Sequence, residues 1–279
     1  MGAVALALLA AIGYGLSDFV GGVAARRVAA LRVVLVSYPL SVLLVALIAP
    51  LVGGRVELGS LLWGALAGVV AGLAVWWFYL ALAAGPMTVV SPLTALLVAV
   101  IPLVAGMLLG ERPAVLALVG AVLALVAVVL VSSNGERSEL PFTRRVALLT
   151  VGSGTAFASY FLLLHQVPTG TGLWPLLASR LGACAVVFVA AVGTRQLRAP
   201  SGVSLRLALG AGVLDVVANA AFLYALQGGL LSLVSVISAL YPAATVALAA
   251  LLLGERTGRV QQAGMVLAAA AVTLIAAQS

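Results

Sequence analysis

Ionisable side chains inside long apolar segments are the residues of this sequence best suited to chemistry. Asp18 lies in the first such segment, and Arg180 and Asp215 lie in two later ones. Asn219 follows Asp215 by one helical turn, so on a helix the two side chains share a face. A charge is costly in apolar surroundings, and we therefore expect these groups to bind a ligand, carry a proton or pair with one another.

Two interpretations stay open for each carboxylate. Asp18 could bind a cationic group or carry a coupling proton, or it could be an interfacial residue beside Arg26 and Arg27. Asp215 could contribute to binding, or it could form a structural ion pair with Arg180, because their segments are consecutive.

Aromatic and hydroxyl side chains inside the apolar segments complete the candidate binding set. They are Tyr14, Trp76, Trp77, Tyr79, Ser91, Thr94, Tyr160, Tyr224, Ser235 and Ser238. The alternative for the aromatic residues is a belt at a membrane interface. The alternative for the hydroxyls is a hydrogen bond back to their own helix.

The composition shows what kind of protein must hold these residues in place. Of the 279 residues, 65% are hydrophobic and only 8% are charged, which is too little polar surface to coat a soluble fold. The cations are all arginine and lie mostly between apolar segments, so the net charge of +7 indicates headgroup anchors and not nucleic-acid binding. The single cysteine, Cys184, permits no internal disulfide. We expect no metal and no cofactor.

The apolar segments predict an all-α integral membrane protein, because helices satisfy their own backbone in lipid and these segments are long enough to span it. Ten spans are expected, at Ala3–Ala24, Val33–Val52, Leu61–Ala84, Met87–Leu109, Ala114–Ser132, Val146–Leu164, Leu173–Val192, Leu205–Leu226, Leu230–Leu253 and Val260–Ala277.

The chain repeats itself at a spacing of 144 residues, with 19 of 48 positions identical between residues 85–132 and 229–276. We therefore divide it into a first repeat over 1–132, a linker over 133–145 and a second repeat over 146–279. Five spans in each repeat force the two repeats into opposite orientations. This predicts an inverted-topology repeat around a central cavity, as in secondary transporters.

The repeated motif contains Glu111 and Arg112 in the first copy and Glu255 and Arg256 in the second. A glutamate at the end of a helix is unfavourable unless it also faces the start of another. We expect Glu111 and Glu255 to cap the fifth and tenth spans and to pair with neighbouring arginines. A gating role for the same pairs is the alternative.

Small residues and prolines indicate how the spans pack. Gly64, Gly68 and Gly72 recur every four residues and predict a close approach between helices. Prolines inside spans predict kinks that could line a cavity or serve packing alone. They are Pro92, Pro102 and Pro242.

Both copies resemble the EamA repeat of the drug/metabolite transporter superfamily. The resemblance rests on residues 85–91, 109–112 and 120 in the first copy and on 229–235, 242, 253–256, 262 and 264 in the second. It implies ten helices, an inverted repeat, alternating access and outward movement of small metabolites. It also implies a cavity lined mainly by spans one, three, four, six, eight and nine. Pro92 departs from the register that would match Pro242.

The function predicted is secondary active export of small metabolites, amino acids or related compounds, by a monomer in the inner or plasma membrane. The closest alternative is a drug/proton antiporter for lipophilic cations that uses Asp18; a membrane-embedded enzyme and a channel are more distant. Expected partners are a small-molecule substrate, membrane lipid and protons, without nucleic acid. The connectors on one side hold 11 arginines and those on the other hold 2, so the positive-inside rule places both termini outside the cytoplasm.

Overall fold

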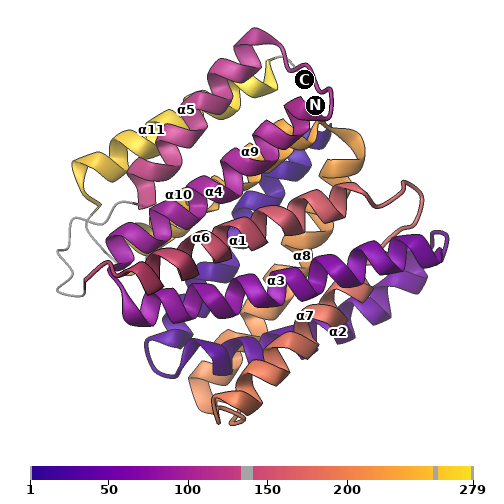
Figure 1. The fold of residues 1–279 in the computed structure, drawn as a ribbon, viewed down its shortest axis with the longest axis vertical. Coiled ribbons are helices and arrows are strands. Elements are labelled where there is room, and N and C mark those ends of the chain that lie inside the picture. The colour runs from indigo at the N-terminus through magenta and orange to yellow at the C-terminus, as the bar shows by residue number, and fades with distance from the viewer. Residues whose placement is uncertain (1, 133–140, 254–256, 278–279) are drawn as a thin grey trace.

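The computed structural model describes residues 2–132, 141–253 and 257–277, and over these residues every regular element is a helix (Figure 1). The first repeat contains α1 (Gly2–Ala25), α2 (Ala30–Val52), α3 (Leu58–Ala84), α4 (Met87–Leu108) and α5 (Val115–Ser132). The second contains α6 (Arg144–His165), α7 (Trp174–Gly193), α8 (Gly202–Gly228), α9 (Leu231–Ser238), α10 (Tyr241–Leu253) and α11 (Arg259–Ala276).

Ten candidate membrane spans are present among the described residues, as the sequence predicts, because α9 and α10 together make one span. The predicted span Leu230–Leu253 is interrupted after Ser238, so the kink predicted at Pro242 is present as a break between α9 and α10. Pro242 has no N–H to donate to the Ser238 carbonyl four residues earlier. The chain turns more tightly there, with Leu240 N bonded to Ile237 O at 3.1 Å and Ala243 N to Leu240 O at 2.9 Å.

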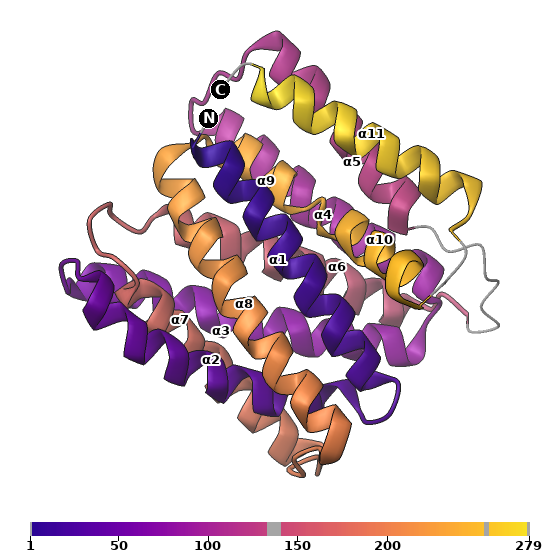
Figure 2. The same cartoon turned by 180° about the vertical axis from the view of Figure 1, so that it is seen from behind.

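The helices pack as two inverted copies related by an approximate two-fold axis. Packing of α1 on α8 corresponds to packing of α6 on α3, and the two first helices, α1 and α6, run in opposite directions (Figure 1). Figure 2 shows α1 and α8 side by side along most of their length. The helix pairs α5·α11, α2·α7 and α4·α9 join equivalent elements of the two repeats.

The connections gather on two faces. We call the face with both chain ends the termini face; it carries loops 53–57, 109–114, 166–173 and 229–230 (Figure 1). The opposite face, which we call the arginine face, carries loops 26–29, 85–86 and 194–201. The described arginines at this end are Arg26, Arg27, Arg32, Arg144, Arg145, Arg195, Arg198, Arg206 and Arg259.

Glycines set the closest helix contact between the repeats. A Cβ on Gly64 would meet the carbonyl oxygen of Pro175, and one on Gly68 would meet that of Ser179, both in α7. The equivalent position in α8, Gly212, would bring a Cβ to 2.8 Å from the Ser37 carbonyl oxygen in α2. The predicted packing role of the glycine stripe in α3 is therefore confirmed.

Candidate functional site

Polar side chains from five helices of both repeats meet between the repeats. We call this set the central cluster. It consists of Tyr14 in α1, Ser41 in α2, Tyr160 in α6, Arg180 in α7, and Asp215 and Asn219 in α8.

The ion pair between Arg180 and Asp215 forms the charged part of the cluster. The Arg180 Nη1 atom donates to Asp215 Oδ2 at 2.9 Å, and the two side chains are 3% and 19% exposed. The expected pairing of these residues is thus confirmed. Because the arginine is almost entirely enclosed, its charge depends on Asp215 for compensation.

Asn219 hydrogen-bonds to four other side chains of the central cluster. Its Oδ1 accepts hydrogen bonds from Tyr14 Oη at 2.9 Å, from Tyr160 Oη at 2.5 Å and from Arg180 Nη2 at 3.3 Å. Its Nδ2 donates to the Asp215 carbonyl oxygen at 2.7 Å and to Asp215 Oδ1 at 2.9 Å. These donors fix the orientation of the amide and tie α1, α6, α7 and α8 together.

Sequence reasoning missed two residues of α2 that lie against the Arg180–Asp215 ion pair. Ser41 Oγ donates to the Gly212 carbonyl oxygen at 3.2 Å and lies 3.3 Å from Asp215 Oδ2. The Arg180 guanidinium carbon lies 5.7 Å from the centre of the Tyr38 ring, a cation–π arrangement. Tyr38 and Ser41 lie three residues apart on a largely apolar helix that also carries Ser37, and this spacing is the signal that could have found them.

One polar atom of the cluster has no partner. Arg180 Nε is buried and donates to no acceptor among the described residues. A guanidinium offers five N–H donors in a planar fork that suits a carboxylate. The unpaired N–H could therefore bind an anionic group that entered the cluster.

Asp18 lies apart from this network and is exposed. Its carboxylate makes no hydrogen bond or ion pair with the described residues, yet it lies in electrostatic range of Asp215, Tyr79 and Tyr241. Asp18 is exposed although it lies seven residues, or about 10 Å, before the end of α1. These three neighbours belong to α8, α3 and α10, respectively.

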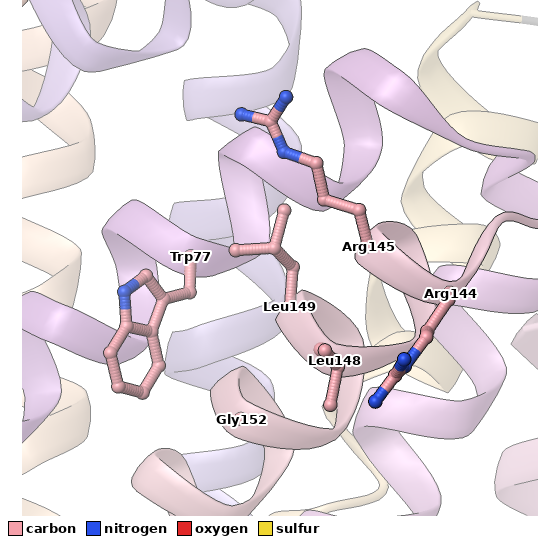
Figure 3. A pocket seen from close by; sticks show the side chains of 6 residues that line it. All are labelled: Trp77, Arg144, Arg145, Leu148, Leu149 and Gly152. Carbon is pink, nitrogen blue, oxygen red and sulfur yellow. The ribbon is translucent and has the colours of Figure 1, made fainter.

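Besides Tyr14 and Tyr160 in the central cluster, the predicted aromatic residues fall into three places. Trp76 and Tyr79 pack with Tyr38 against an apolar cluster between α2, α3 and α7. Trp77 lies in an outer groove between α3 and α6 (Figure 3). Tyr224 is half-buried against the main apolar core.

The predicted hydroxyl residues lie on α4 and α9. Ser91 is half-buried, Thr94 is 2% exposed, and Ser235 and Ser238 are fully buried. The hydroxyls of Thr94, Ser235 and Ser238 have no partner among the described residues. Tyr241, which follows the break in α9–α10, packs edge-to-face on Tyr14 with ring centres 6.5 Å apart, so the break adjoins the central cluster.

The capping prediction for Glu111 is wrong about its target. Its Oε1 accepts from Leu231 N at 2.6 Å and its Oε2 from Ser232 N at 2.9 Å, so it caps α9 of the other repeat. The loop after α4 places the carboxylate beside the start of α9, whose free N–H groups and positive dipole end attract it. It makes no ion pair with Arg112. Glu255 and Arg256 lie outside the described residues.

The family model for the EamA-like transporter family matches residues 1–133 and 144–277, nearly the whole sequence in two copies. The chain belongs to the EamA-like transporter family. This EamA-like protein is a multi-pass membrane transporter of the drug/metabolite superfamily that takes a small-molecule substrate in a lipid environment.

Solved structures agree with this fold. A structure described as a crystal structure of a protein superposes on the EamA-like chain with a TM-score of 0.76 and 16% identity, covering 97% of this chain and 99% of the other. No curated protein matches the sequence. No group of three or more His, Cys, Asp or Glu residues suited to a metal occurs in the described ranges.

The two ends of the EamA-like fold differ in how tightly they close. Every residue of α9, near the termini face, is buried, whereas residues 241–250 of α10, near the arginine face, are all half-buried. On the termini face, Arg55 N donates to Gly170 O at 2.9 Å and joins loops of the two repeats. Among described residues, no backbone hydrogen bond joins the equivalent loops 26–29 and 194–201. The fold is therefore closed at the termini face and looser at the arginine face.

Proposed function

We propose that this transporter exports small zwitterionic metabolites, amino acids or related compounds, by alternating access between its two repeats, as a monomer. The observation that carries the proposal is the central cluster, because it places a buried cation with an unused N–H donor between the repeats. A second polar group, Asp18, is exposed and has no compensating cation among described residues.

An amino acid offers both charges that these groups can recognise. Arg180 Nε can donate to the substrate carboxylate, and Asp18 can accept from its ammonium group. Tyr79 and Tyr241, which lie in electrostatic range of Asp18, add aromatic rings suited to a cation. Side-chain specificity would then come from the aromatic residues of α3, Trp76 among them.

The looser arginine face and the arginine distribution support outward transport. The positive-inside rule places the arginine face in the cytoplasm. A conformation closed at the termini face then receives its substrate from the cytoplasm, as an exporter must. The broken span α9–α10 beside the cluster supports a site at mid-membrane, where inverted-repeat transporters place discontinuous helices.

The test is uptake of radiolabelled amino acids into proteoliposomes preloaded with unlabelled substrate. We expect Asp18→Asn to abolish exchange while the protein still elutes as a folded monomer. The matched control is Glu57→Gln, a carboxylate removed from an exposed loop of the termini face. Undiminished exchange in Asp18→Asn, or no exchange of any amino acid by the wild type, would overturn the proposal.

A second candidate function is proton-coupled export of lipophilic cations. The observation that favours it is the uncompensated Asp18 carboxylate with two tyrosines in electrostatic range. In the same proteoliposomes, an imposed pH gradient would drive tetraphenylphosphonium movement, and Asp18→Asn would abolish it. Cation transport without amino-acid exchange would favour this candidate.

A further inference from the structure

An open groove lies on the outer surface between α3 and α6, near the arginine face. Its volume is about 600 Å³, within the range of sites that hold small molecules. It is lined by Trp77 from α3 and by Arg144, Arg145, Leu148, Leu149 and Gly152 from α6 (Figure 3).

The outer end of the groove is cationic. Arg144 and Arg145 form the first turn of α6, both are exposed, and neither pairs with an acidic group among described residues. Their side chains project to different sides of the helix start (Figure 3). The positive end of the helix dipole adds to the same potential. This end therefore attracts an anion.

The inner end of the groove is apolar and faces lipid. Leu148 is 65% exposed, which at this depth means contact with acyl chains and not with the central cluster. Gly152 leaves the wall open beside the indole, because a Cβ there would lie 3.2 Å from Trp77 Cε3. Gly152 lies eight residues after Arg144, so the groove runs about 12 Å from the cationic end into the membrane.

The repeat symmetry is broken at this groove. The positions 144 residues before Gly152 and after Trp77 are Leu8 and Ala221, which offer neither the gap nor the indole. The start of α1 carries no arginine pair. The groove therefore belongs to one face of the protein only, and simple duplication of a packing motif does not account for it.

We propose that this groove binds an anionic phospholipid of the leaflet at the arginine face. The phosphodiester accepts hydrogen bonds from Arg144 and Arg145, and an acyl chain lies along Leu148 and Gly152 against the Trp77 ring. A cationic end at headgroup depth above an apolar wall matches this one class of ligand. Because α3 belongs to the first repeat and α6 to the second, the bound lipid bridges the repeats on the face that is looser.

The experiment measures lipid binding to the purified full-length protein by native mass spectrometry, with phosphatidylglycerol and phosphatidylcholine as probes. The double variant Arg144→Gln/Arg145→Gln should bind phosphatidylglycerol about thirtyfold more weakly than the wild type. The matched control, Arg195→Gln/Arg198→Gln, removes two exposed arginines from the same face and should bind as the wild type does. Phosphatidylcholine should bind weakly to all three proteins.

Three outcomes would overturn the proposal. They are equal weakening in both double variants, equal binding of the two lipids, and displacement of phosphatidylglycerol by inorganic phosphate, which would indicate a site for soluble anions. Gly152→Leu tests the apolar end with both arginines intact, and it should weaken phosphatidylglycerol binding because its side chain fills the gap. If this variant does not fold, Trp77→Leu replaces it, with the same expected loss.

Discussion

Replacing Asp215 by asparagine removes the charge that compensates Arg180 without changing the size of the side chain. Arg180 is 3% exposed, so its charge cannot recover hydration when the carboxylate is lost. Removal of one partner from a buried ion pair costs about 3–5 kcal/mol. Asp215 is 19% exposed, and Asn can still accept the Arg180 hydrogen bond, so the low end applies, about 3 kcal/mol.

The assay is thermal unfolding in detergent, followed by intrinsic tryptophan fluorescence. At roughly 2–4 °C for each kcal/mol, Asp215→Asn should lower the Tm by about 6–12 °C. The matched control is Asp18→Asn, another carboxylate inside a span but one without an ion-pair partner among described residues, and it should change stability by less than about 0.5 kcal/mol.

A double variant separates loss of charge compensation from loss of packing. Arg180→Met/Asp215→Leu removes both charges, and such replacements of buried pairs are often neutral or better. Asn219 keeps its bonds to Tyr14 and to the backbone carbonyl of residue 215 in this variant. The double variant should therefore melt above Asp215→Asn. A Tm for Asp215→Asn within about 2 °C of the wild type, or a double variant that is no more stable, would refute the reasoning.

Three further predictions address packing, capping and the helix break. Gly68→Ala should destabilise by about 2–3 kcal/mol, because the new Cβ meets the Ser179 carbonyl, whereas Gly59→Ala in the same helix has open space and should be neutral in the same melting assay. Glu111→Ala should lower the free energy of unfolding by about 1–2 kcal/mol by removing the cap of α9, with Glu111→Gln between it and the wild type; equal melting of all three would contradict this. Pro242→Ala restores a backbone donor and should slow substrate exchange in proteoliposomes without lowering the Tm, and an unchanged exchange rate would show that the break has no part in transport.

The sequence predicted the architecture well because lipid imposes simple rules on it. Ten spans followed from apolar length alone, and an odd number of spans in each repeat required opposite orientations. The ion pair of Arg180 with Asp215 could also be predicted from the sequence, because few charges lie inside spans and each needs a partner.

Contacts between the repeats were harder to predict. Glu111 was assigned to the nearest helix start in the chain, whereas the structure gives it the start of α9, 120 residues away. The spacing of Tyr38 and Ser41 indicates that they share a face of α2, but it does not show that this face turns toward α7 and α8. Pro242 was predicted to kink its span, and the structure shows a break between α9 and α10 there.

What the sequence by itself determined is therefore the set of helices, their count and their inverted order, since backbone hydrogen bonding in lipid and apolar length fix these locally. Only the tertiary structure decided that Asn219 accepts from donors of three other helices, that Glu111 caps α9, and that Asp18 is exposed. The physical reason is that side-chain partnership in a helix bundle depends on the rotation and depth of each helix. Close packing at residues such as Gly68 sets that rotation, and no local pattern of the chain encodes it.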